Sequence, residues 1–112
     1  MQGFDAELCP RFNQAVEIIG RRWSGSVLRL LLDGATRFHE LSDSIPGISD
    51  KMLSERLKEL EAGGLINRVV EPTTPVRVEY HLTPMGESLR PIMDAVSTWA
   101  NEWIDSPQPS NL

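Results

Sequence analysis

The sequence is poor in positive charge, has a single cysteine and contains no long apolar run. Eleven lysines and arginines stand against sixteen aspartates and glutamates, and the net charge of −5 is the wrong sign for long-range attraction to phosphate. Cys9 has no second cysteine with which to form a disulfide in the chain, which agrees with a reducing compartment. No segment reaches membrane-spanning length and no signal-peptide pattern is present, so we expect a cytoplasmic protein without a membrane partner.

The residue patterns of catalysis and metal binding are also missing. His39 and His81 lie far apart and have no neighbour at ligand spacing, which argues against a metal site. The sequence has no glycine-rich phosphate loop and no nucleophile motif, and its carboxylates fall mostly on faces that we expect to be solvated. We therefore predict a protein that is not an enzyme and that uses no cofactor.

A short helical pattern covers about residues 37 to 45. Its apolar side chains recur at helical spacing and predict one face turned toward a core; they are Phe38, Leu41 and Ile45. Pro46 disfavours helical geometry at the residue before it, and Gly47 tolerates the backbone of a tight reversal. This helix should therefore end at the Pro-Gly pair.

A second helical pattern follows at once, over about residues 49 to 62. Ser49 can cap its first turn, and Gly63-Gly64 can take the left-handed conformation that ends a helix. Its buried stripe consists of Leu53, Leu57 and Leu60. Two helices joined by three or four residues predict a helix-turn-helix motif, a shape that fits a DNA groove.

The period changes to that of β-strands over about residues 65 to 82. Every second residue from Val76 to Leu82 is apolar, which predicts a half-buried strand, and residues 65 to 71 form a less regular partner. Pro72 and Pro75 cannot lie in the middle of a ladder, so they belong in the connection. We expect an antiparallel hairpin with an exposed, stiff tip.

Helical patterns flank the motif on both sides. Residues 1 to 34 predict two helices, and the second is apolar almost all round, as in a central core helix. A last helix should run over about residues 84 to 104 with a kink at Pro91, and residues 105 to 112 should form a disordered tail. The expected architecture is one domain over residues 1 to 104, mainly α-helical with a small antiparallel β-hairpin, of the winged helix-turn-helix class.

The last helix carries an apolar stripe about four turns long. Its members include Leu89, Met93, Val96, Trp99, Ala100 and Trp103. A domain of this size has little core left for so wide a stripe, and tryptophan is enriched at interfaces, so we favour half of a homodimer interface. The alternative is that the two tryptophans cover the core of their own chain.

The helical periodicity of residues 49 to 62 selects candidate contacts with DNA. With the leucines turned inward, the opposite side presents Lys51, Glu55 and Lys58, with Ser54 beside them. The alternative is a solvated face on which lysines and glutamates pair with one another. Arg77, on the outer side of its strand near the hairpin tip, is the natural contact from the wing, and Arg37 and Arg68 are further candidates, although a strand arginine is often only solvated.

Eleven short stretches, in their order and spacing, resemble the HxlR-type winged-helix transcriptional regulators, relatives of the MarR group. They are Cys9-Pro10, Ile19-Gly20, Trp23, Arg37 to Leu41, Pro46 to Ser49, Met52 to Leu60, Gly64 to Ile66, Val78 to Tyr80, Leu82-Thr83, Gly86 and Trp99. The resemblance spans about residues 9 to 103. It implies a dimer built from N- and C-terminal helices, a recognition helix at residues 49 to 62, a wing at residues 70 to 78 and control of a nearby operon.

The resemblance also bears on individual residues. It favours an arginine at Arg56 as a phosphate contact, although geometry places this residue near the edge of the buried face. Met52 lies at a flank, where it packs on the first motif helix or touches a thymine methyl. The complete set of expected DNA-binding residues is Ser49, Lys51, Met52, Ser54, Glu55, Arg56, Lys58 and Arg77. The wing departs from the family pattern at Pro75-Val76, where a Pro-Pro pair is frequent.

The expected function is sequence-specific binding of double-stranded DNA by a homodimer that regulates transcription from an inverted-repeat operator. The alternative is a winged-helix module that binds another protein and no DNA. Some members of the resembled family sense oxidants or electrophiles through a cysteine at the place of Cys9, whereas a lone thiol near a chain end is usually inert. A response to an oxidant or to a small-molecule effector is thus a further hypothesis.

Overall fold

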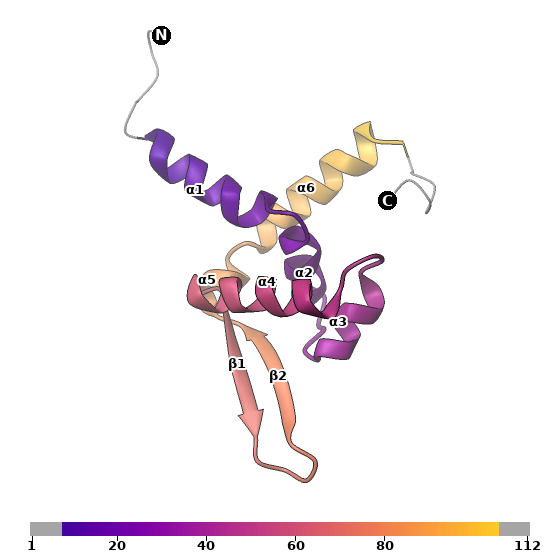
Figure 1. Cartoon of the computed structure of the whole chain (residues 1–112). Helices are drawn as coiled ribbons and strands as arrows, with labels where there is room; N and C mark the ends of the chain where they lie inside the picture. The colour runs from indigo at the N-terminus through magenta and orange to yellow at the C-terminus, as the bar shows by residue number, and fades with distance from the viewer. Residues whose placement is uncertain (1–7, 106–112) are drawn as a thin grey trace, which may run out of the picture.

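The computed structural model describes residues 8 to 105. In chain order the elements are α1 Leu8–Gly20, α2 Ser24–Leu32, α3 Phe38–Ser44, α4 Asp50–Ala62, β1 Ile66–Glu71, β2 Arg77–Leu82, α5 Pro84–Glu87 and α6 Arg90–Trp103. Helices α1 and α6 project from one end of the molecule, and the hairpin projects from the other (Figure 1). The expected fold class, mainly α-helical with a small antiparallel hairpin, is confirmed.

The hydrophobic core lies where α2, α3 and α4 meet. Val27 and Leu28 of α2 are fully buried, and they pack in one cluster with Leu41 of α3 and Leu53 of α4. The three leucines of the stripe predicted in residues 49 to 62 are at most 3% exposed. Because a fully buried leucine contributes about 1.5 to 3 kcal/mol, these contacts fix which face of α4 is turned outward.

The two motif helices have the ends that the sequence predicted to within one residue. Helix α3 begins after Arg37, where the Glu40 carboxylate accepts hydrogen bonds from the backbone N–H groups of Thr36 at 2.9 Å and Arg37 at 2.8 Å. These two bonds lower the pKa of the Glu40 carboxyl. Gly47, with φ at 84°, then reverses the chain toward α4.

The hairpin is antiparallel, with Ile66 opposite Leu82 at its base and Glu71 opposite Arg77 toward its tip. The strand predicted to be half-buried has that character at Val78, Tyr80 and Leu82, which are partly covered. Val76, expected on the same face, lies just before β2 and is 62% exposed. The backbone N–H of Tyr80 donates to the carbonyl of Thr36 at 2.8 Å. This bond ties the wing to the segment just before α3.

The single kinked helix expected over residues 84 to 104 is instead two helices, α5 and α6. Pro91 lies in the first turn of α6, where its missing N–H has no intrahelical partner to lose, so the chain restarts there rather than bending. Gly86 of α5 lies so close to the chain that a Cβ atom at this position would be 2.1 Å from the carbonyl oxygen of Leu65. The end of the hairpin thus packs directly on α5.

Two expectations concern parts of the chain that are not described. Of the tail expected to be disordered, residues 105 to 112, all but residue 105 lie outside the described residues. Cys9 belongs to the first turn of α1, but its side chain also lies outside them.

Candidate nucleic-acid interface

Helix α4 begins with the cap that the sequence predicted. The Ser49 hydroxyl accepts a hydrogen bond from the backbone N–H of Met52 at 3.0 Å. The remaining unpaired N–H groups give this end of the helix a partial positive charge that attracts anions. Asp50, in the same turn, opposes that attraction. The helix terminus alone is therefore a weak phosphate site, and side chains must contribute.

The outer face of α4 carries most of the expected DNA contacts. Exposed side chains are Ser49, Lys51, Glu55 and Lys58, and half-buried ones are Met52 and Ser54. None of the lysines on this face pairs with a glutamate among residues 10 to 105. The described structure thus shows no lysine–glutamate pairing on this face, the arrangement that we had weighed as the alternative.

Most arginines in the described part of the chain are paired with carboxylates of the chain. The pairs join Arg21 and Arg56 to Glu59, Arg29 to Asp33 and Asp94, Arg77 to Glu79 and Arg90 to Glu87. Among residues 10 to 105, the cations without an ion pair are Arg37, Lys51, Lys58 and Arg68 in the motif and first strand, and Arg11 and Arg22 in and just after α1. Cations able to bind a polyanion therefore gather mainly on the helix-turn-helix and the wing.

A polar cleft separates α4 from the wing. Its volume is about 430 Å³, and its lining residues are Ser54, Leu57, Lys58, Glu61, Arg68 and Tyr80. Arg68 and Tyr80 are opposite one another in the hairpin register, which brings both side chains to the sheet face that meets α4. The set of expected DNA-binding residues left out Arg68, which was only a further candidate, and did not consider Tyr80. Their alternation along the strands was the available signal, but only the packing of the hairpin shows which face meets the helix.

The phosphate contact expected of Arg56 needs correction. This residue is only 7% exposed. Its Nε donates to the carbonyl oxygen of Arg22 at 2.9 Å, and its terminal nitrogen donates to Glu59 at 2.9 Å. Position 56 lies at the edge of the buried stripe, and the long guanidinium turns inward along that edge. The Arg56 side chain therefore makes contacts inside the protein and is not available on its outer surface.

Arg77 is exposed on the outer side of β2, as predicted, but it is not free of partners. Its Nε donates to Glu79 at 2.9 Å, and the other carboxylate oxygen of Glu79 lies 2.8 Å from Nε2 of His81. The hydrogen bond with His81 is the main cause that lowers the pKa of the Glu79 carboxyl, and the charge of Arg77 adds to it. A phosphate would compete with Glu79 for this arginine.

The apolar stripe of α6 divides into two parts. Leu89, half-buried, and Met93, 8% exposed, pack against the core of the same chain. Ala100 is half-buried, while Val96, Trp99 and Trp103 are 53%, 59% and 72% exposed. On α1, Phe12 and Val16 are exposed in the same way. The alternative that the two tryptophans cover the core of their own chain is therefore wrong, because only the first turn of α6 faces that core. The dimer interface stays a prediction.

Among the described residues, no cluster of three or more histidine, cysteine, aspartate or glutamate side chains is arranged to hold a metal ion. The described helices are all too short or too polar to span a membrane.

Comparisons with known proteins agree with this geometry. The family of HxlR-like helix-turn-helix proteins matches residues 18 to 108. YvaP of Bacillus subtilis, described as an uncharacterized HTH-type transcriptional regulator, is 50% identical over 100 residues that cover 89% of this chain and 93% of YvaP. YodB of the same organism, an HTH-type transcriptional regulator, is 42% identical over 98 residues and 88% of each chain.

Solved structures match over most of the chain as well. The reduced form of YodB from B. subtilis superposes with a TM-score of 0.76 at 41% identity, covering 89% of this chain and 98% of that one. The redox regulator HypR in its oxidized form has a TM-score of 0.80 at 34% identity, with coverage of 86% and 99%. The chain therefore belongs to the HxlR-like helix-turn-helix family of transcriptional regulators, which are DNA-binding proteins and not enzymes.

Proposed function

We propose that this regulator binds an inverted-repeat operator as a homodimer, with α4 in the major groove and the hairpin beside it. The observation that carries the proposal is the placement of unpaired cations. In a chain of net charge −5, four of the six cations without an ion pair among residues 10 to 105 lie just before α3, on α4 and on β1, and the other two lie in and just after α1. A local patch of this kind supplies phosphate contacts without an overall cationic field.

Within the groove, the first half of α4 would read bases. Lys51 reaches a phosphate or the acceptor edge of a guanine, and Ser49 and Ser54 hydrogen-bond to either kind of group. Glu55 accepts from the amino group of a cytosine, and Met52 contacts a thymine methyl. Arg56 is not among the proposed contacts, because its side chain is buried.

The backbone of the operator would be held by the cleft between α4 and the wing. Lys58, Arg68 and Tyr80 line this cleft, and side chains of these types can donate hydrogen bonds to a phosphate. Glu61, also in the lining, weakens the attraction and sets a limit on how much this cleft contributes. Arg77 would make a second phosphate contact farther along the wing after exchanging its partner Glu79.

The dimer would form through the exposed apolar faces of α1 and α6. Single large apolar side chains at a surface are common, whereas a group that includes two tryptophans on projecting helices is typical of an interface. In a two-fold dimer the recognition helices would lie about 34 Å apart and read two half-sites one helical turn apart. Since its target is chromosomal DNA, we place the protein in the cytoplasm.

Cys9 would give the regulator its sensitivity to oxidants or electrophiles. The similar structures include YodB in reduced, diamide-treated and quinone-bound forms and HypR in reduced and oxidized forms. The chain has one cysteine, so an oxidant would link it to the cysteine of a second subunit or to an external thiol. Operator binding by Cys9→Ser that still responds normally to diamide would exclude this role.

The decisive experiment selects binding sequences from a random duplex pool. We expect recovered sequences to share two inverted half-sites, and the complex to weaken steeply as salt rises. Recovery of a single unrepeated site would contradict the dimeric geometry. Indifference to every duplex and to heparin at low salt, with capture of a protein partner, would instead support a protein-binding winged helix.

A further inference from the structure

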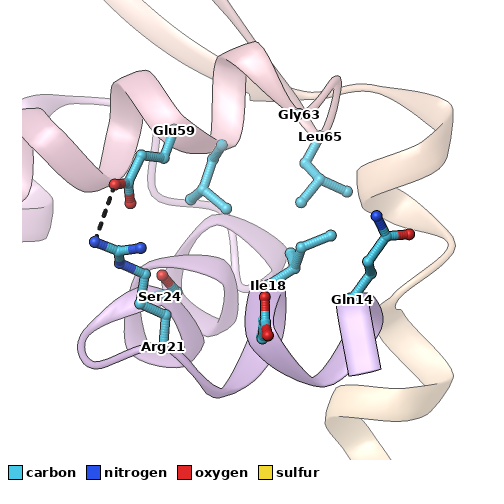
Figure 2. A pocket seen from close by; sticks show the side chains of 9 residues that line it. Gln14, Ile18, Arg21, Ser24, Glu59, Gly63 and Leu65 are labelled. Atoms are coloured by element: carbon cyan, nitrogen blue, oxygen red, sulfur yellow. Dashed lines mark ion pairs between the residues drawn. The ribbon is translucent and has the colours of Figure 1, made fainter. Parts of the chain in front are cut away.

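A buried guanidinium joins the recognition helix to the junction between α1 and α2. Arg56 donates from α4 to the carbonyl oxygen of Arg22 at 2.9 Å and to Glu59, one turn along its own helix, at 2.9 Å. The second oxygen of Glu59 lies 3.3 Å from Arg21, the residue that follows α1. Figure 2 shows this outer ion pair, with Glu59 reaching from α4 toward Arg21 across the end of an open cavity.

The junction itself is held in an uncommon backbone conformation. Trp23 has a φ of 77°, in the left-handed region that non-glycine residues seldom occupy, and such a residue persists where its surroundings fix it. The guanidinium of Arg22 stacks 4.7 Å from its ring. The far edge of the ring lies 3.6 Å from where a Cβ atom of Gly47 would be, in the turn that leads into α4. The junction between α1 and α2 therefore contacts both the turn before α4, through Trp23, and the middle of α4, through Arg22.

Resting on the DNA-binding function proposed above, we infer that Arg56 is a positioning residue. It locks α4 to the end of α1 through Arg22 and Glu59, so that the direction of α1 sets the direction of α4 against the groove. Because α1 is also part of the proposed dimer interface, the spacing of the two recognition helices then depends on this joint, by which we mean the contacts of Arg56 and Glu59 with Arg21 and Arg22. Arg56 acts on affinity through geometry and does not touch DNA.

Two substitutions at position 56 separate positioning from contact. Arg56→Lys keeps the positive charge but cannot donate in the fork that reaches Arg22 and Glu59 together, and Arg56→Met keeps the length without the charge. We expect both variants to bind the selected operator about tenfold more weakly or worse, with the slope of log affinity against log salt unchanged. Lys58→Ala, a proposed phosphate contact, should lower that slope by about 0.9.

The opposite outcomes are equally specific. If Arg56→Lys bound normally while Arg56→Met lost about 0.9 in slope, Arg56 would be a phosphate contact and the inference would fail. If both variants melted at lower temperature yet bound the operator normally at temperatures where circular dichroism shows them folded, the role would be stability alone, which also overturns it. Absence of binding by the unaltered protein would instead overturn the proposed function and the inference together.

For Glu59, the positioning role predicts a change in operator affinity opposite to the one that charge alone predicts. Removing a negative charge from α4 should strengthen binding to a polyanion, and we expect this of Glu61→Gln, the matched control on the same helix. Glu59→Gln removes the same charge but weakens the hold on Arg56 and Arg21, so we expect weaker operator binding. Stronger binding by Glu59→Gln, equal to that of the control, would show that the joint does not position α4.

Discussion

At the scale of single side chains, pairing within the chain decides which cations can meet a polyanion. Glu59 engages two arginines, and Glu79 engages Arg77 and His81. Lys51 and Lys58 have no such partner among residues 10 to 105. The net charge of −5 is therefore a poor guide to DNA binding, since a phosphate group interacts mainly with the charges within about a Debye length of it.

Ser49 both caps α4 and is a proposed contact with DNA, and two substitutions separate these roles. Ser49→Ala removes the bond to the Met52 amide and should lower the free energy of unfolding by about 1 kcal/mol. Ser49→Asp keeps an acceptor for that amide but adds a negative charge beside the DNA. We expect it to unfold at nearly the same urea concentration as the parent and to bind the operator more weakly.

Ser44→Ala is the control for this pair, since Ser44 is an exposed serine that ends α3 and does not cap α4. Equal operator affinity for Ser49→Asp and the parent would remove residue 49 from the interface. An unchanged urea midpoint for Ser49→Ala would show that the cap contributes no stability.

Glu40 predicts a pH dependence whose sign follows from its bonds. The backbone N–H groups of Thr36 and Arg37 lower the pKa of Glu40 below the ordinary 4.5. The ionised carboxylate is therefore more stable in the folded than in the unfolded state. The stability it contributes is present above pH 4.5 and is lost as pH falls through the lowered folded pKa. We expect Glu40→Gln to be less stable than the parent at pH 7, with the difference disappearing in acid. A difference that persisted in strong acid would contradict this origin.

At the scale of the elements, close contact between backbones constrains α5. A Cβ atom on Gly86 would lie 2.1 Å from the Leu65 carbonyl oxygen, and backbone cannot swing aside as a flexible side chain can. We expect Gly86→Ala to lower the free energy of unfolding by about 1 to 3 kcal/mol. Gly20→Ala, where the nearest atom is a Val16 methyl at 3.7 Å, is the control and should not destabilise. A thermal melt of both variants is sufficient, and equal melting temperatures would refute the close contact.

Local patterns predicted the elements well and their mutual contacts poorly. The leucines of α4, the Ser49 cap and the alternation of β2 follow from periods and propensities that a short segment carries by itself. The inward turn of Arg56 depends on a carbonyl 34 residues away, and the cleft depends on how the hairpin lies against α4. Neither has a local signal. The break before α6 does have a local signal, which is Pro91. A proline has the same sequence pattern whether it kinks one helix or begins a second one, so the sequence does not decide between them.

At the scale of the whole molecule, the surfaces proposed for DNA binding and for dimerisation lie at opposite ends. The hairpin projects from one end and the apolar arms α1 and α6 from the other (Figure 1). Core residues Leu89 and Met93 anchor the first turn of α6, and the remainder extends away with its tryptophans exposed. Substitutions on the far half of α6 should therefore change assembly and leave the fold of the subunit intact.

Trp99→Ser together with Trp103→Ser tests this separation. Buried tryptophans at interfaces commonly contribute about 2 kcal/mol or more each, so we expect the dissociation constant of the dimer to rise at least about 30-fold per residue. Sedimentation velocity should show a monomer at concentrations where the parent is a dimer, with the same far-ultraviolet circular dichroism. Binding to a duplex with one half-site should change little, because α4 is untouched.

Val76→Ser is the matched control, because Val76 is 62% exposed at the other end of the molecule, just before β2. It removes exposed apolar area of the same kind, and we expect the dimer to persist. On the full inverted repeat, the tryptophan variant should lose the gain in affinity that linked half-sites give, since each subunit must then bind alone. A monomeric parent protein would contradict the proposed dimer, and a tryptophan variant that still sediments as a dimer would move the interface away from α6. The direction in which α1 and α6 project would then serve something other than the spacing of recognition helices.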